Sequence, residues 1–65
     1  MSVPMNRVAI ITEMARRHMT CNKLVELSGV SRVTITAVRN GKSCSRETAD
    51  KLAAVLGRGI IRKEA

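Results

Sequence analysis

The segment 20–41 restricts the fold more than any other part of the sequence. Its apolar residues recur at helical spacing in two short runs, first Leu24, Val25 and Leu27, then Ile35 and Val38. Gly29 separates the runs, at a point where a helix end favours a residue that adopts a left-handed backbone. Thr20 and Ser31 each precede a run, where a hydroxyl group can cap the free amides of a helix start. The pattern predicts two short helices joined by a tight turn, over residues 21–28 and 32–40.

The second predicted helix has an exposed side suited to duplex DNA. With Ile35 and Val38 facing inward, Arg32 and Arg39 flank outward residues that are small or partly apolar: Val33, Thr36, Ala37 and Asn40. An α-helix with such a surface fits the major groove, where base edges offer hydrogen-bonding groups and thymine methyls. Residues 27–46 contain four cations and no acid, so a positive stretch is centred on this helix.

The charge of the whole chain agrees with a polyanionic partner. A formal net charge of +7 favours nucleic acid or an acidic membrane, although a merely soluble basic domain also fits this composition. Phe, Tyr and Trp are absent. Readers of single strands and RNA, and membrane-surface helices, rely on such rings, so duplex DNA is favoured. No apolar run could span a bilayer and nothing resembles a signal peptide, so we expect a cytoplasmic protein without membrane contact.

Catalytic, metal and cofactor chemistry is not expected. The chain has one His and no metal-binding cluster, so we predict no enzyme. Cys21 and Cys44 have neither close spacing nor His partners, which predicts inert thiols rather than a zinc site. A length of 65 residues leaves no room for a separate sensing domain, so no small-molecule ligand is expected.

The remaining residues predict an all-α fold around one core. Residues 6–18 form a predicted helix with Val8, Ile11 and Ala15 on one face and Ile10 and Met14 beside it. Residues 46–56 form another, capped by Ser45, with a buried stripe of Ala49, Leu52, Ala53 and Leu56. The tail 58–65 adds Ile60 and Ile61, and no β pattern is visible. We therefore predict one compact domain over 1–65, near the smallest size at which one core suffices.

The order of these features resembles the Xre/Cro-like, or lambda repressor-like, helix-turn-helix family. The resemblance runs from about Ile10 to Ile60. Its strongest stretches are Thr20 with Leu24, the corner Gly29-Val30-Ser31, Ile35 followed by Asn40-Gly41-Lys42, and the final Ala53, Leu56 and Gly57. It implies a compact domain of four to five helices with a central helix-turn-helix at 20–41, and a recognition helix at about 32–40 in the major groove.

The resemblance also implies roles for individual residues. The amides at the start of the helix over 21–28, at Cys21 and Asn22, would face a phosphate. Arg32, Val33 and Ala37 match positions that touch base edges, with Thr34 and Thr36 beside them, while Asn40, Lys42 and Arg46 match positions that clamp the DNA backbone. The whole implied DNA-binding set is Thr20, Cys21, Asn22, Ser31, Arg32, Val33, Thr34, Thr36, Ala37, Asn40, Lys42, Ser43 and Arg46. The alternatives are that Val33 is an ordinary surface valine and that Lys42 and Arg46 form a solvated rim.

The chain departs from the family pattern at a few positions. Cys21 stands where a Gln is usual, Val25 where a small Ala is usual, and His18 where a Gly is usual. Arg39 stands where relatives carry an acidic residue, which pairs with a basic residue on the helix that corresponds to 6–18. Since Glu13 is the only acid of that helix, we predict an inverted ion pair between Glu13 and Arg39. The alternative for Arg39 is a phosphate contact.

The favoured function is a sequence-specific DNA-binding transcriptional regulator, of the small repressor type found in phages and mobile elements. It would act as a homodimer on a two-fold operator, with Ile60 and Ile61 contributing to the dimer because adjacent isoleucines cannot both face one core. The alternative is that both isoleucines fold onto the predicted helices over 6–18 and 46–56. Two other functions remain open: an architectural protein or recombination directionality factor that bends DNA, and an antitoxin-type protein-interaction module.

Overall fold

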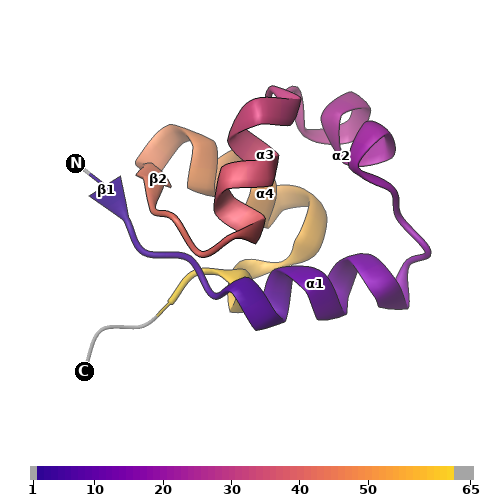
Figure 1. Ribbon diagram of the computed structural model, residues 1–65, viewed down its shortest axis with the longest axis horizontal. Helices are drawn as coiled ribbons and strands as arrows, with labels where there is room; N and C mark the ends of the chain where they lie inside the picture. The colour runs from indigo at the N-terminus through magenta and orange to yellow at the C-terminus, as the bar shows by residue number, and fades with distance from the viewer. Residues whose placement is uncertain (1, 63–65) are drawn as a thin grey trace.

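A computed structural model describes residues 2–62 and confirms the all-α class (Figure 1). Its helices are α1 at Arg7–Arg16, α2 at Cys21–Ser28, α3 at Arg32–Arg39 and α4 at Arg46–Leu56, followed by a short 3-10 helix, η1, at Arg58–Ile60. The predicted bounds differ from these by at most two residues at each end. The part of the predicted tail beyond residue 62 lies outside the described residues.

Side-chain caps explain where the helices begin. Thr20, Ser31 and Ser45 each accept a hydrogen bond from the amide three residues ahead, with N–O distances of 3.1, 3.3 and 3.2 Å. Asn6 does the same for α1, where its Oδ1 accepts from the amide of Ala9 at 3.1 Å. Each bond satisfies one of the amides that a helix start leaves free. These caps set the start of α2 and α3, and therefore the position of the candidate site.

A small β-ribbon was not predicted. Strands β1 (Ser2–Val3) and β2 (Cys44–Ser45) pair antiparallel, with Val3 opposite Cys44. An isolated bridge also joins Met5 to Ile61. Elements of two residues are too short to show the alternation that marks a strand in a sequence. They are held because Val3 and Cys44 pack against the core and Met5 is inside it.

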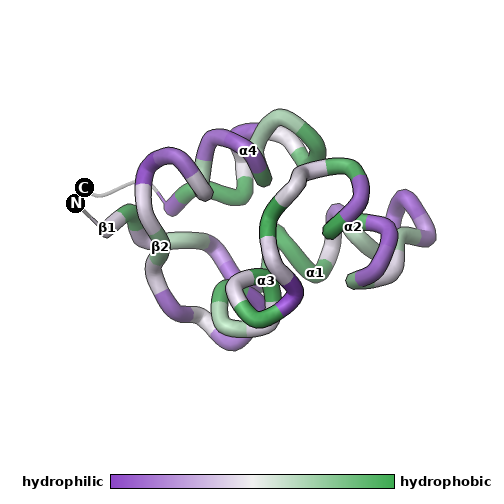
Figure 2. The backbone as a smooth tube through the Cα atoms, turned by 90° about the horizontal axis from the view of Figure 1, so that it is seen from above, coloured by the Kyte–Doolittle hydropathy of each residue, from purple (hydrophilic) through white to green (hydrophobic). Residues whose placement is uncertain are grey.

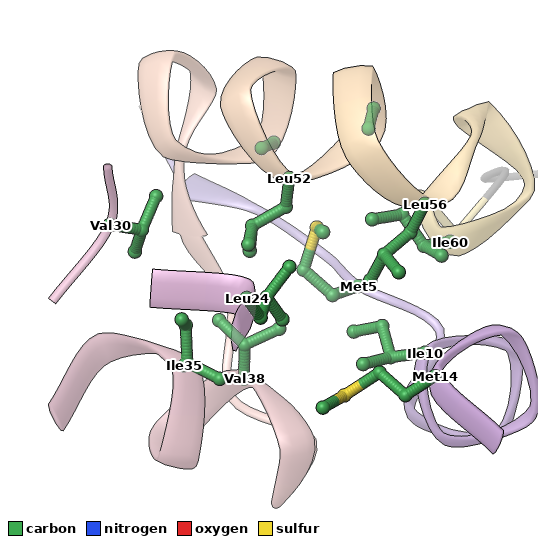
Figure 3. Close-up of a cluster of buried hydrophobic side chains, with 12 residues drawn as sticks. Met5, Ile10, Met14, Leu24, Val30, Ile35, Val38, Leu52, Leu56 and Ile60 are labelled. Carbon is green, nitrogen blue, oxygen red and sulfur yellow. The ribbon is translucent and has the colours of Figure 1, made fainter. Parts of the chain in front are cut away.

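The core selects one of the two apolar faces of α1. Ile10 and Met14 point inward and are 1% and 6% exposed, whereas Val8 is 68% exposed and Ile11 39%. Both faces of α1 are apolar, so helical spacing alone could not select between them. Leu24 lies at the centre of the core, and the side chains around it come from every other helix (Figure 3). They include Ile35 and Val38 of α3, Leu52 and Leu56 of α4, and Ile60 of η1.

The two ends of the described chain meet along a seam formed by residues 4–6 and 60–62. The amide of Asn6 donates to the carbonyl of Ile60 at 2.6 Å, and the amide of Arg62 donates to the carbonyl of Pro4 at 3.0 Å. Ile60 is fully buried and Ile61 is half-buried beside Met5. Both isoleucines therefore pack against the core, and Ile61 keeps part of its side chain at the surface. We call this arrangement the terminal seam.

Candidate DNA-binding surface

The corner between α2 and α3 is a compact glycine turn. Gly29 has φ +72°, and its amide donates to the carbonyl of Val25 to close α2. Val30 follows and is 6% exposed. The hydroxyl of Ser28 donates to the carbonyl of Leu24 at 2.6 Å and accepts from the amide of Val30 at 3.2 Å. This hydroxyl was not among the predicted features, and it holds the two helices in a defined relative position.

The outward side of α3 is the one predicted from the sequence. Ile35 and Val38 are 1% exposed and face the core, which leaves Val33 81% exposed on the other side. Arg32, Thr36 and Asn40 are also exposed, and Thr34 and Ala37 are half-buried at the edges. Seen from above, α3 and α4 lie on opposite sides of the molecule (Figure 2), and the high exposure of Val33 shows that this face is uncovered in the described chain.

A side-chain contact links the end of α3 to the start of α2. Arg39 Nη1 donates to Cys21 Sγ at 2.9 Å, and Arg39 Nε is buried without a hydrogen-bond partner among residues 2–62. Thr20 and Asn22 on either side of Cys21 are exposed. Arg39 therefore joins α3 to α2, which neither the ion-pair prediction nor its alternative foresaw.

The predicted Glu13–Arg39 ion pair is wrong. Glu13 bonds instead to two cations of its own helix region: Arg16 Nη1 lies 3.1 Å from Glu13 Oε2, and Arg17 donates to Oε1. Partners three and four residues away on one helix surface are neighbours without any tertiary contact, so they take the carboxylate. The hydrogen bond from Arg17, with the charges of Arg16 and Arg17, lowers the pKa of Glu13 despite some desolvation.

The loop after α3 carries the remaining predicted contacts. Lys42 and Ser43 are exposed, and the amide of Lys42 donates to the carbonyl of Ala37 at 3.1 Å, which folds the loop back onto α3. Arg46 is also exposed, but its Nε lies 3.4 Å from Asp50 Oδ1. A surface pair of this kind contributes about 0–1 kcal/mol, so a phosphate can replace the carboxylate at little cost.

A small cavity beside this loop was missed in the sequence. It measures about 300 Å³ and is lined by Met5, Asn6, Arg7, Val8, Gly41 and Arg62. No sequence signal links residue 7 to residue 62, because the terminal seam brings them together only in the folded chain.

Within residues 2–62, no group of three or more His, Cys, Asp or Glu side chains could hold a metal ion. No helix in that range has the length and apolarity needed to cross a membrane.

The fold and this surface define a helix-turn-helix DNA-binding domain. A family model for the Cro/C1-type HTH DNA-binding domain matches residues 10–60, and the chain belongs to this family. The match confirms the resemblance drawn from the sequence, along with duplex DNA as the partner and transcription regulation as the broad role. Neither the curated proteins nor the solved structures gave a significant match.

Proposed function

We propose that this protein is a cytoplasmic repressor of the kind encoded by phages and mobile elements, and that it binds a two-fold operator as a homodimer. The observation that carries the proposal is the uncovered face of α3, where Val33 is 81% exposed next to the exposed Arg32. A helix that reads bases needs side chains that leave the domain and reach the groove floor. Arg32 and Val33 are in the first turn of α3, the part that enters the groove deepest in this docking mode.

Each side chain on this face has a base-edge chemistry. Arg32 can donate two hydrogen bonds to the O6 and N7 atoms of guanine, and Val33 can pack against a thymine methyl. Thr36 and Thr34 carry hydroxyls that donate and accept, and Ala37 allows the helix to approach closely. Specificity therefore comes from α3.

Affinity comes from the two segments on either side of α3. The free amides at the start of α2, at Cys21 and Asn22, attract a phosphate, and the Thr20 hydroxyl is exposed next to them. Asn40, Lys42, Ser43 and Arg46 serve a second stretch of backbone. Phosphate contacts of this kind fix the register on DNA without selecting a sequence.

Two alanine substitutions test this division of roles. Sequences bound by the wild type are first selected from random duplex DNA, and the affinity is then measured at several salt concentrations. Arg32→Ala should cost roughly 1–3 kcal/mol and relax the preference at one base position. Lys42→Ala should weaken binding to all sequences and lower the log–log salt slope by about one.

The control is Lys51→Ala on α4, whose amine lies 3.4 Å from Glu47 Oε1 and which is not among the proposed DNA contacts. It should change neither the consensus nor the slope. An unchanged consensus for Arg32→Ala would mean that α3 does not read bases as proposed. Direct repeats among the selected sequences, in place of inverted half-sites, would instead favour an architectural or recombination role.

The dimer is part of the proposal because a two-fold operator presents two half-sites related by symmetry. Ile60 is fully buried in its own protomer, so Ile61, which is half-buried, is the isoleucine that can also contact a partner. Sedimentation of wild type and Ile61→Lys, with and without a duplex carrying two half-sites, tests this. A wild type that remains monomeric on that duplex would remove the dimer from the proposal.

A further inference from the structure

The cavity between the terminal seam and the loop after α3 contains two arginines. Of the residues that line it, Met5 is buried and the others are exposed: Asn6, Arg7, Val8, Gly41 and Arg62. A volume of about 300 Å³ lies at the lower end of the range for sites that take small groups, roughly 300–1,000 Å³. Because most of its lining residues are exposed, the cavity is an open recess that a surface group of a large partner can enter.

The electrostatics of this recess favour an anion. Arg7 and Arg62 supply two guanidinium groups, and no acidic residue is among the residues that line it. The carboxylates of residues 2–62 that form ion pairs do so with other cations: Arg16, Arg17, Lys23, Arg46, Lys51 and Arg58. A guanidinium presents several N–H donors in a fork that matches two oxygens of a phosphate.

The recess is next to the proposed DNA contacts. Gly41 follows directly after the C-cap of α3, and a Cβ at Gly41 would lie 3.8 Å from Arg7 Cδ. Lys42, a proposed phosphate contact, is the next residue. Figure 1 shows the start of α1 below the C-terminal end of α3, with the loop to β2 beside it. A DNA strand that passes Lys42 therefore passes the mouth of the recess.

We propose that Arg7 and Arg62 hold one phosphate of the DNA backbone in this recess, which we call the seam clamp. The inference rests on the proposed function and extends its phosphate contacts to the two ends of the described chain. The backbone hydrogen bonds of the seam, Asn6 to Ile60 and Arg62 to Pro4, hold together the two chain segments from which Arg7 and Arg62 line the recess. One phosphate shared by two arginines distinguishes this site from two independent surface contacts.

The test uses salt titrations of duplex binding for Arg7→Ala, Arg62→Ala and the double variant. Loss of one shared phosphate should lower the log–log salt slope by about one in each single variant. The double variant should also lose only about one in total, because the two arginines share that phosphate. The consensus should stay unchanged. Arg7→Lys and Arg62→Lys keep the charge and should retain the wild-type slope. Arg16→Ala, which removes an exposed arginine paired with Glu13 at the far end of α1, is the matched control and should have no effect.

Wild-type slopes in both single alanine variants would overturn the seam clamp, and a loss of about two in the double variant would replace it by two separate contacts. Circular dichroism of each variant checks that the fold is retained. A wild type stabilised against heat by inorganic phosphate, with duplex affinity unaffected by either arginine, would assign the recess to a free phosphate and also overturn the proposal. Failure of the proposed function is distinct, because the wild type itself would then show no salt-dependent duplex binding.

Discussion

The turn at Gly29 allows a quantitative test, because the chain also contains a glycine, Gly59, whose backbone is not left-handed. Gly29 has φ +72°, a left-handed conformation that side chains with a Cβ rarely adopt. Gly59 lies in η1 outside the positive-φ region. In both places an added Cβ would have no atom within 4 Å. Substitution by Ala therefore introduces no clash at either site, and the backbone conformation alone decides the outcome.

The expected effects have opposite signs. At Gly29 the left-handed conformation costs Ala about 1–2 kcal/mol. Ala also restricts the unfolded chain, which favours folding by about 0.4–1 kcal/mol. From these two values the net loss for Gly29→Ala lies between about 0 and 1.6 kcal/mol, with a central value of about 0.8 kcal/mol. At Gly59 only the second effect operates, so Gly59→Ala should stabilise the protein by about 0.4–1 kcal/mol.

Thermal unfolding followed by circular dichroism can resolve this difference. A change of 1 kcal/mol shifts Tm by roughly 4–8 °C in a domain of 60–100 residues, so the two variants should move several degrees in opposite directions. Gly29→Asn, which tolerates the left-handed region better, should lie between Gly29→Ala and wild type. Equal Tm shifts for the two alanine variants would show that position 29 does not require the left-handed backbone conformation.

Further predictions concern the core, a cap and a carboxylate. Leu24→Ala should cost about 2–5 kcal/mol in urea unfolding, whereas Leu27→Ala, at a side chain that is 52% exposed, should cost far less; similar losses would contradict the central place of Leu24. Ser45→Ala should lower the free energy of unfolding by about 1 kcal/mol through loss of the α4 cap, and Ser45→Thr should largely retain it. The pKa of Glu13 is lowered in the folded protein, so its contribution to stability is present above the unfolded pKa and is lost as the pH falls through the folded pKa. An NMR titration should therefore show Glu13 ionising at lower pH in wild type than in Arg17→Ala, and identical titrations would rule out the Arg17 hydrogen bond as the cause.

Local signals account for most of what the sequence predicted correctly. The caps at Thr20, Ser31 and Ser45 and the left-handed Gly29 act within one helical turn, so their effect is visible in a short window of residues. The inward side of α3 was also predictable, because Ile35 and Val38 leave only small and polar residues on the opposite side. The candidate base-reading face therefore follows directly from the local pattern.

Features that depend on distant contacts were not predictable. Two apolar faces compete on α1, and only the position of α1 against α3, α4 and η1 decides that Ile10 and Met14 are buried rather than Val8 and Ile11. Arg39 bonds to Cys21 because of the way α2 and α3 cross, which no spacing in the sequence reveals. The recess of the seam clamp is the extreme case, since its two arginines lie at opposite ends of the described chain.

The terminal seam also has a consequence for the order of folding. Pairing Met5 with Ile61 closes a loop that contains almost the whole chain, whereas α2 and α3 meet across a short turn. Closure entropy grows with the logarithm of loop length, so the seam is favoured only after the helices between its ends have packed. In this order, β1 pairs with β2 and Met5 packs into the core in the last step. We expect a seam that closes last to open first on unfolding, and a phosphate held between Arg7 and Arg62 would keep the two ends of the fold together while the protein stays on DNA.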